Sequence, residues 1–456
     1  MINYILNKKA PLFWLIFHII LGAISTVTPW ILIFWFYSVL GTSLFRLVKS
    51  DVGSSVPLVF LIAYATSFEL LARMSGTSPY VPYELGKYLL FFLLVFGILK
   101  GYRRGYIGWL MVILILPGAF FHLAGESTFK NIVFNLIGPV NVALAVIFFR
   151  NQEMERGNFI ETMRLMIYPL VSVLAFTVMK APDLKTVEFT LKANFETSGG
   201  FGTNQVSTAL GLGAFLVFLF FRKKWTLTGY RWLDLVMFLF FIFRGLITFS
   251  RGGMIGGALG IMLFLILDRG EYGVERVFKP VRLVLTAVPI LLLLVFTFIY
   301  ADKITGGLLA QRYQGETPGT LAGRKEKTLN VIISNRLQIF SDDLKLWEAN
   351  PVFGVGVGAS VHLRGKSKGF LSHIEISRLL SEHGIPGLIY VIILFNVGVN
   401  IFRQHRYVVY GGILAAIYMI ALFTTFHSAM RTYVSPLFFG LSMLSVMEVD
   451  YEENAE

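Results

Sequence analysis

Two arginines in polar breaks between apolar runs are the first candidates for chemistry. Arg251 stands in Ser250-Arg251-Gly252-Gly253, between two apolar runs. An arginine at a membrane boundary is costly unless it is paired, functional or extended into water. Arg336 opens the segment 335–349, where apolar residues recur at helical spacing. Guanidinium groups pair with phosphate oxygens, so both arginines are candidates for anion binding, with a solvent-reaching role as the alternative for Arg251.

His373 is the candidate proton acceptor. Ser372-His373-Ile374-Glu375 fits a capping box in which Glu375 reaches back to Ser372, and it predicts a helix from about residue 372 to Gly384. In the first turn of that helix, the dipole would favour a bound anion and disfavour a protonated imidazole. A neutral histidine can take the proton of a hydroxyl. The alternative is a solvated or structural histidine.

Four other residues are candidates for substrate binding. Arg378 follows Glu375 by three residues, which predicts a charged helix face. Arg324 lies in a polar, Gly-rich stretch, and a second such stretch, 198–205, contains Asn204. Asn204 could bind sugar hydroxyls or cap the helix that follows.

Two further patterns near Arg336 allow more than one interpretation. Gly354-Val355-Gly356-Val357-Gly358 could form a turn or cradle a phosphate, although no Gly-Lys-Ser/Thr follows as in a P-loop. An apolar stripe in 335–349 is expected to pack on the membrane domain, with a lipid-binding role as the alternative. The residues of this stripe are Leu337, Phe340, Leu344 and Trp347.

The composition identifies the surroundings of these residues as a membrane. Of 456 residues, 55% are hydrophobic and 15% are charged, whereas soluble domains have about 25% charged residues. The absence of cysteine excludes disulfides and thiolate catalysis. The net charge of +13 is concentrated in short loops and no nucleic-acid motif accompanies it, so we expect no nucleic-acid partner.

Apolar runs along the chain predict an all-α polytopic integral membrane protein with about 12–14 transmembrane helices. One large extracytoplasmic loop is expected to contain helices of its own. The candidate spans are 11–25, 29–47, 55–73, 84–99, 106–123, 131–149, 158–179, 204–221, 232–249, 252–267, 282–300, 384–402, 408–425 and 432–447.

The distribution of lysine and arginine sets the predicted orientation. With the N-terminus inside, every short inner loop is basic, as the positive-inside rule requires, and both termini are cytoplasmic. We therefore divide the chain into a transmembrane bundle at 1–300, a large periplasmic loop at 301–383 that carries part of the active site, and C-terminal transmembrane helices with a short cytoplasmic tail at 384–456.

Taken together and in order, these motifs resemble the O-antigen ligase and polymerase family. The resemblance covers roughly residues 195–390 and includes a Gly-Thr-Asn-Gln sequence at 202–205. One departure is Ile374, where many relatives have asparagine. The other motifs that carry the resemblance are Ser250-Arg251-Gly252-Gly253, Asn335-Arg336, Asn350-Pro351-Val352-Phe353-Gly354-Val355-Gly356, His373-Ile374-Glu375 and Glu382-His383-Gly384-Ile385-Pro386-Gly387.

This resemblance implies a metal-independent inverting glycosyltransferase without cofactors, located in the bacterial inner membrane with its active site on the periplasmic face. The donor would be a glycan on undecaprenyl pyrophosphate. The family's functional arginines would correspond to Arg251 and Arg336, and its histidine to His373. A ligase passes the glycan to lipid A-core, whereas a polymerase passes it to a second lipid-linked glycan.

Ligase is the first prediction and polymerase the alternative, because the sequence does not report the acceptor. A lipid-linked glycan transporter is a further alternative. Transporters place polar residues near the membrane midplane, whereas here the charges concentrate in the outer loop. A non-catalytic binding or assembly protein is the third alternative, and only the resemblance argues against it.

Overall fold

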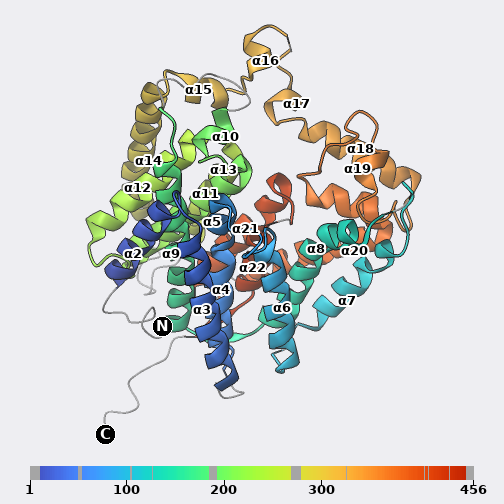
Figure 1. Ribbon diagram of the computed structural model, residues 1–456, viewed down its shortest axis with the longest axis horizontal. Coiled ribbons are helices and arrows are strands. Elements are labelled where there is room, and N and C mark those ends of the chain that lie inside the picture. Colours follow the sequence, from blue (N-terminus) through green and yellow to red (C-terminus); the bar gives the residue numbers. More distant parts are fainter. Residues whose placement is uncertain are drawn as a thin grey trace.

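The computed structural model describes residues 11–49, 54–102, 105–125, 127–183, 193–268, 279–324, 326–404, 406–408, 410–430 and 432–447. Long helices run side by side through the lower part of the molecule, and short helices lie across its upper end (Figure 1). The terms upper and lower refer to this view throughout.

Helices account for nearly all of the regular structure among the described residues. The helices of ten or more residues are α2 (Pro11–Ile24), α3 (Trp30–Lys49), α4 (Val56–Ser67), α6 (Leu85–Leu99), α7 (Tyr106–Ile115), α8 (Phe129–Phe149), α9 (Arg156–Met179), α11 (Thr203–Lys223), α12 (Arg231–Ile247), α13 (Arg251–Leu267), α14 (Lys279–Ile304), α18 (Arg336–Ala349), α20 (Glu375–Gln404) and α21 (Gly411–His427). The shorter elements are α5 (Glu69–Ser75), η1 (Pro117–Ala119), α10 (Ala193–Thr197), α15 (Leu308–Tyr313), α16 (Pro318–Leu321), α17 (Leu329–Ile332), α19 (Ser360–Leu363), α22 (Val434–Leu441), and the strands β1 (Glu153–Glu155) and β2 (Ser445–Met447).

Six stretches of helix are long and apolar enough to cross a membrane: α3, α4 with α5, α8, α9, α11 and α20. Five shorter apolar stretches, α2, α6, α7 with η1, α13 and α21, each pack against one of them. These findings confirm an all-α, multi-pass membrane protein. The larger number of spans inferred from hydropathy remains a prediction.

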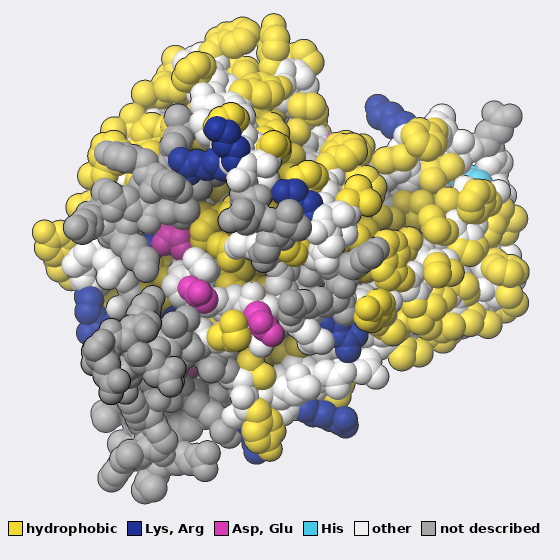
Figure 2. All heavy atoms as spheres, turned by 90° about the horizontal axis from the view of Figure 1, so that it is seen from below, with side chains coloured by type: hydrophobic (Ala, Val, Ile, Leu, Met, Phe, Trp, Pro, Cys, Tyr) yellow, Lys and Arg dark blue, Asp and Glu magenta, His cyan; other side chains and the backbone are white. Residues whose placement is uncertain are grey.

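Burial separates the inner helices from the outer ones. In α9 and α11 most residues are buried. In the most apolar stretch of α3 and of α20, only 33% of the residues are buried. Figure 2, seen from below, shows hydrophobic side chains over the flanks of the molecule and charged side chains nearer the middle of the lower face. Such an apolar exterior suits contact with lipid, where helices satisfy their own backbone hydrogen bonds.

The last predicted span, 432–447, differs in the structure. Helix α22 covers only Val434–Leu441, about 12 Å at 1.5 Å per residue, and every one of its residues is buried. It packs between α8 and α21, so it faces protein rather than lipid and need not cross a bilayer by itself. Beyond it, β2 pairs in parallel with β1, with Met154 opposite Val446, and ties the lower ends of α8, α9 and α22 together.

Two rows of glycine on α13, each with a spacing of four residues, allow three helices to meet closely. A Cβ atom on Gly253 would lie 2.1 Å from the backbone nitrogen of Thr208, and one on Gly257 would lie 2.4 Å from the carbonyl oxygen of Gly211, both on α11. On the other row, a Cβ atom on Gly252 would lie 2.8 Å from the ring of His427 on α21. Helix α13 is thus wedged between α11 and α21, with Arg251 at its upper end.

Helix α18 forms where the sequence predicts it, but the side it buries is different. Its buried residues are Ile339, Asp342 and Asp343, whereas Leu337 of the apolar stripe is 44% exposed. Asp343 pairs with Arg364 at 2.7 Å, and both side chains are fully buried. The side of α18 that contains the two aspartates therefore packs inward, because buried partners satisfy their carboxylates.

The capping box predicted at the start of α20 is absent. The helix begins at Glu375 rather than Ser372, and Ser372 Oγ accepts a hydrogen bond from the Ile374 N–H at 3.2 Å. Glu375 points into the protein and pairs with Arg378. His373 therefore lies two residues before the first helical residue, and the argument from the first turn does not apply to it. The predicted helix end at Gly384 appears as a non-helical break (φ 63°) within α20.

Candidate active site

A cavity of about 450 Å³ lies at the upper end, between the starts of α11 and α13 and the segments that contain α15, α17 and α18. Asn204, Arg251 and Arg336, which are distant in the sequence, all line it. Arg312 and Tyr313, on α15, also line it. We call this cavity the arginine pocket.

Backbone carbonyl groups hold each of the three arginines. Arg251 donates to the carbonyl oxygen of Ile332. Arg312 donates from Nε to the carbonyl oxygen of Phe249 at 3.3 Å, and Arg336 donates from Nη2 to the carbonyl oxygen of His427 at 3.1 Å. Such bonds fix the position of a guanidinium group without neutralising its charge.

Among the described residues, none of these three guanidinium groups has a carboxylate partner. Burial, and then the nearby charge of Arg251, lower the pKa of Arg312 and of Arg336, yet arginine remains protonated at neutral pH. The Nε of Arg336 is buried and has no hydrogen-bond partner among the residues described. The pocket is thus a concentration of positive charge with donors available to a bound anion.

Tyr313 adds a neutral donor to the pocket. Burial raises its pKa to about 12, although the charge of Arg251 acts in the opposite direction. Its hydroxyl is buried and makes no hydrogen bond within the described part of the chain. At neutral pH it is therefore protonated and could donate to a ligand oxygen.

The backbone is strained at three residues in or next to the lining of the pocket. Of the seven described residues other than glycine with positive φ, Ser334 lines the pocket, and Phe249 and Asn335 adjoin residues that line it. Each such residue costs on the order of 1–3 kcal/mol, and strain of this kind clusters at functional sites.

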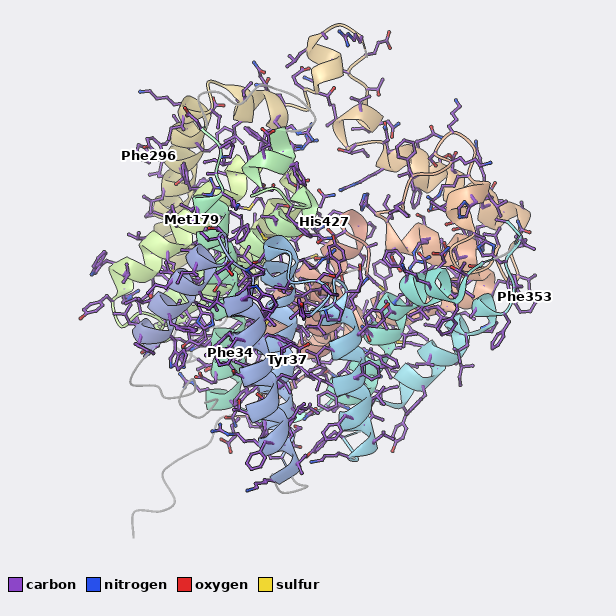
Figure 3. The ribbon with its side chains drawn as sticks, in the orientation of Figure 1. Phe34, Tyr37, Met179, Phe296, Phe353 and His427 are labelled. Atoms are coloured by element: carbon purple, nitrogen blue, oxygen red, sulfur yellow. The ribbon has the colours of Figure 1, made fainter. Side chains whose placement is uncertain are left out.

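His373 does not line the pocket, but its backbone is connected to Arg336 through the turn after α21. The carbonyl of His427, the last residue of α21, accepts from Arg336, and two residues later the Ala429 N–H donates to the His373 carbonyl oxygen at 3.2 Å. The imidazole of His427 is buried against α13 and lies 2.9 Å from Thr208 Oγ1. Figure 3 shows His427 at the foot of the space between the two upper groups of helices.

The comparison with known families agrees with this geometry. Residues 235–392 match the family model described as O-antigen ligase. This part of the chain, which we call the matched region, is similar to the O-antigen ligase family. The match confirms the resemblance that the motifs indicate, and it includes Arg251, Arg312, Arg336 and His373. No curated protein matches the sequence.

The family supports an activity of the ligase or polymerase type, which joins glycans, with lipid-linked glycan and membrane lipid as partners in general terms. Parts of the site lie outside the matched residues. Asn204, on α11, precedes the matched region, and His427, on α21, follows it. The described residues contain no group of three His, Asp or Glu side chains that could hold a metal ion.

The structure does not bring all of the predicted residues together in the arginine pocket. Arg378 and Glu375 are buried and pair with each other, and Arg378 also pairs with Glu382 at 2.9 Å. Glu375 accepts a hydrogen bond from the Met430 N–H at 3.2 Å, so it supports the same turn that reaches His373. Arg324 is exposed beyond α16 and does not line the pocket.

Asn204 lines the arginine pocket and is also held within the protein. Its Oδ1 accepts a hydrogen bond from Ser250 Oγ at 3.0 Å, which links the start of α11 to the residue before Arg251. Gly202, rather than Asn204, occupies the N-cap position of α11. The amide nitrogen of Asn204 makes no hydrogen bond within the described part of the chain, so it is available to a ligand.

The Gly-rich segment after α18 is a structural turn. The Val355 N–H donates to Ser381, the Gly356 N–H to Glu382, and the Val357 N–H to Gly118. A Cβ atom on Gly356 would lie 2.2 Å from the carbonyl oxygen of Phe121. Backbone N–H groups used in this way cannot also cradle a phosphate, and the close packing explains the glycine.

The sequence interpretation missed Arg312, Tyr313 and His427. Arg312 is one of several basic residues in a polar loop, so its type alone did not distinguish it. His427 carried a usable signal, because a histidine at the end of an apolar run is unusual in a membrane helix and indicates function.

Proposed function

We propose that the protein is an O-antigen ligase that transfers an O-antigen-type glycan from undecaprenyl pyrophosphate to lipid A-core in the arginine pocket. The observation that carries the proposal is the group of three arginines without a carboxylate partner among the described residues. A pyrophosphate is a compact anion whose oxygens suit the planar donors of guanidinium groups.

The proposed reaction is a displacement at the anomeric carbon with inversion. A hydroxyl of the acceptor forms the new C–O bond while the bond between that carbon and the pyrophosphate oxygen breaks, and the electron pair leaves with the pyrophosphate. Negative charge grows on that oxygen, so Arg251, Arg312 and Arg336 stabilise the transition state more than the ground state. His373 accepts the proton of the attacking hydroxyl.

The supporting residues have separate roles in this proposal. Arg378 and Glu375, which the sequence suggests as substrate-binding residues, act on the substrate only indirectly, by holding the turn beside His373. Asn204 binds a sugar hydroxyl through its amide nitrogen, and Arg324 remains a candidate for contact with the longer glycan outside the pocket.

We place the arginine pocket on the periplasmic side of the bacterial inner membrane. Basic residues at the opposite ends of α3 and α11, namely Arg46, Lys49, Arg222 and Lys223, support this orientation. Both termini would then be cytoplasmic.

The first test is transfer by the purified protein. The donor is undecaprenyl-pyrophosphate glycan, and the acceptor is either lipid A-core or a second lipid-linked repeat. We expect glycan on lipid A-core, and we expect its loss in Arg251→Ala and His373→Ala. A ladder of longer lipid-linked chains would instead identify a polymerase with the same site, and no product from a folded protein would favour a transporter.

The same assay tests metal independence. Because the proposed charge stabilisation comes from arginines, EDTA should leave the rate unchanged. Loss of activity in EDTA, with recovery on addition of Mg²⁺, would contradict this part of the proposal.

A further inference from the structure

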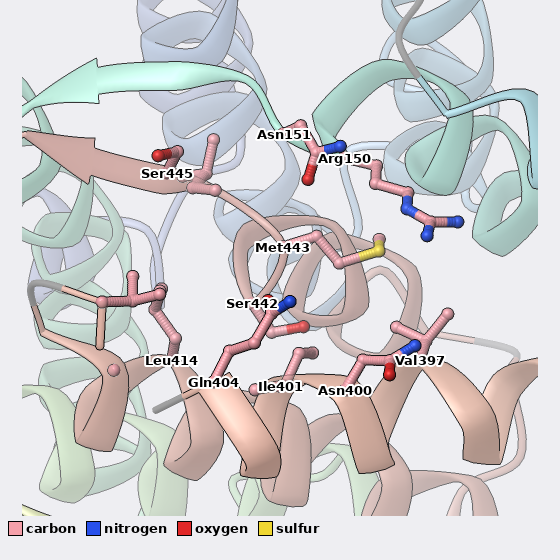
Figure 4. A pocket seen from close by; sticks show the side chains of 13 residues that line it. Arg150, Asn151, Val397, Asn400, Ile401, Gln404, Leu414, Ser442, Met443 and Ser445 are labelled. Carbon is pink, nitrogen blue, oxygen red and sulfur yellow. The ribbon is translucent and has the colours of Figure 1, made fainter. Parts of the chain in front are cut away.

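A second cavity, of about 350 Å³, lies at the lower end of the molecule, opposite the arginine pocket. Its walls come from the end of α8, the last turns of α20, the start of α21 and the segment between α22 and β2 (Figure 4). The parallel pairing of β1 and β2 holds this last segment beside the residues that follow α8. Its volume is in the range of sites that bind small molecules.

The polar groups of this cavity are those that bind a phosphate ester. Arg150 has no hydrogen bond or ion pair through its guanidinium group to any described residue. The amides of Asn400 and Gln404 and the hydroxyl of Ser445 share the lining with Arg150. A guanidinium group binds phosphate oxygens, and amides serve ester carbonyls and hydroxyls.

Helix α20 supplies a second, independent observation. Asn396, Asn400 and Gln404 recur every fourth residue and so form a polar row on one side of the helix. The amide Nδ2 of Asn400 lies 3.0 Å from Asn396 Oδ1. Polar residues within a membrane helix are costly and mark function. The row rises about 12 Å along the helix from the cavity, at 1.5 Å per residue.

The surface beside this polar row is apolar and exposed. Ile392, Phe395 and Val399 of α20 all face outward, as expected of a helix that contacts lipid tails. Val397, Ile401 and Leu414 form an apolar part of the cavity wall. A ligand with a charged head, polar linkages and long hydrocarbon chains would match the cavity, the row and the exposed face in that order.

We propose that this cavity binds the headgroup of an anionic phospholipid from the lower leaflet. Its phosphate lies on Arg150, its glycerol and ester groups lie along Asn400 and Asn396, and its acyl chains lie on the outer face of α20. Basic pockets between membrane helices at the cytoplasmic side are suited to such headgroups. The site is separate from the proposed transfer reaction and does not depend on it.

Native mass spectrometry of the detergent-purified full chain tests the proposal. The protein is titrated with dioleoylphosphatidylglycerol and, separately, with dioleoylphosphatidylcholine. Arg150→Gln should weaken the binding of phosphatidylglycerol about tenfold, since it removes a charged hydrogen-bond donor. Arg403→Gln is the matched control, because Arg403 is exposed on α20 and does not line the cavity.

Asn400→Leu provides a second variant that narrows the cavity without a change of charge, and it carries the test if Arg150→Gln does not fold. We expect weaker binding of phosphatidylglycerol in this variant as well. Equal affinity of the wild-type protein for both lipids, or binding unchanged in both variants, would overturn the proposal. Displacement of phosphatidylglycerol by millimolar inorganic phosphate would show a free-anion site instead of a lipid site.

Discussion

Two groups of buried or half-buried arginines in this protein differ in their partners. Arg364 and Arg378, in the α18–α20 region, pair with Asp343, Glu375 and Glu382. In the arginine pocket, Arg251, Arg312 and Arg336 donate only to backbone carbonyls among the described residues.

This difference in partners separates arginines that stabilise the fold from arginines that can bind a ligand. A buried charge needs a partner, and a guanidinium group with a carboxylate partner has few donors left for a ligand. Guanidinium groups bonded to carbonyls keep their charge, so their mutual repulsion favours an incoming anion. We therefore expect substitutions in the first group to affect folding and substitutions in the second to affect transfer.

The largest effect is expected for Arg378→Met. Removal of this arginine leaves the buried carboxylates of Glu375 and Glu382 without their partner, which typically costs about 3–5 kcal/mol of stability. Thermal unfolding followed by tryptophan fluorescence should show a large loss, and Glu375→Gln in the same chain should restore part of it. If Arg378→Met were as stable as the wild type but inactive in transfer, Arg378 would instead be a substrate-binding residue.

For Arg336→Gln we expect a loss of transfer activity without a large loss of stability. Its guanidinium group is proposed to stabilise the leaving pyrophosphate, and loss of such a donor costs about 10²–10³ in kcat, or about 2.7–4 kcal/mol. Stability should change little, because no ion pair is broken. Lys345→Gln, at an exposed position of the same helix α18, is the control and should retain its rate. Equal losses in both variants would contradict a special role for the pocket.

The sequence predicts only part of this division between structural and ligand-binding arginines. The motifs at Arg251 and Arg336 indicate anion binding, and the structure brings both to one cavity. Arg364 could not be classified, because its pairing with Asp343 is a tertiary contact between α18 and the residue after α19. The partners of Arg378 lie three and four residues away on α20, but this spacing does not reveal that the charged face is buried. Hydrophobic periodicity also cannot reveal that Asp343 is buried, because a satisfied buried carboxylate looks like any other polar residue in the sequence.

Addition of a carboxylate to the pocket should make the second group resemble the first. Ser334 lines the pocket at φ 61°, a conformation that aspartate and asparagine tolerate better than most residues. Ser334→Asp supplies the missing partner, so we expect transfer to fall by about tenfold or more, since a like charge opposes the pyrophosphate. Ser334→Asn keeps the shape without the charge and should transfer normally. Similar activity in the two variants would argue against electrostatic binding of the donor.

The smallest effect concerns Asp342, which neighbours Asp343 but has no arginine partner among the described residues. Burial alone would raise the pKa of Asp342, but the hydrogen bonds that Ser367 and Gln338 donate outweigh it and lower the pKa below its usual 3.8. A lowered pKa stabilises the folded state above pH 3.8, and this contribution is lost as the pH falls through the folded-state value. Asp342→Asn should cost about 1 kcal/mol at neutral pH and should remove this part of the acid dependence of thermal unfolding. If the thermal stability of Asp342→Asn fell at low pH as much as that of the wild type, the hydrogen bonds to Asp342 would not favour its ionised form.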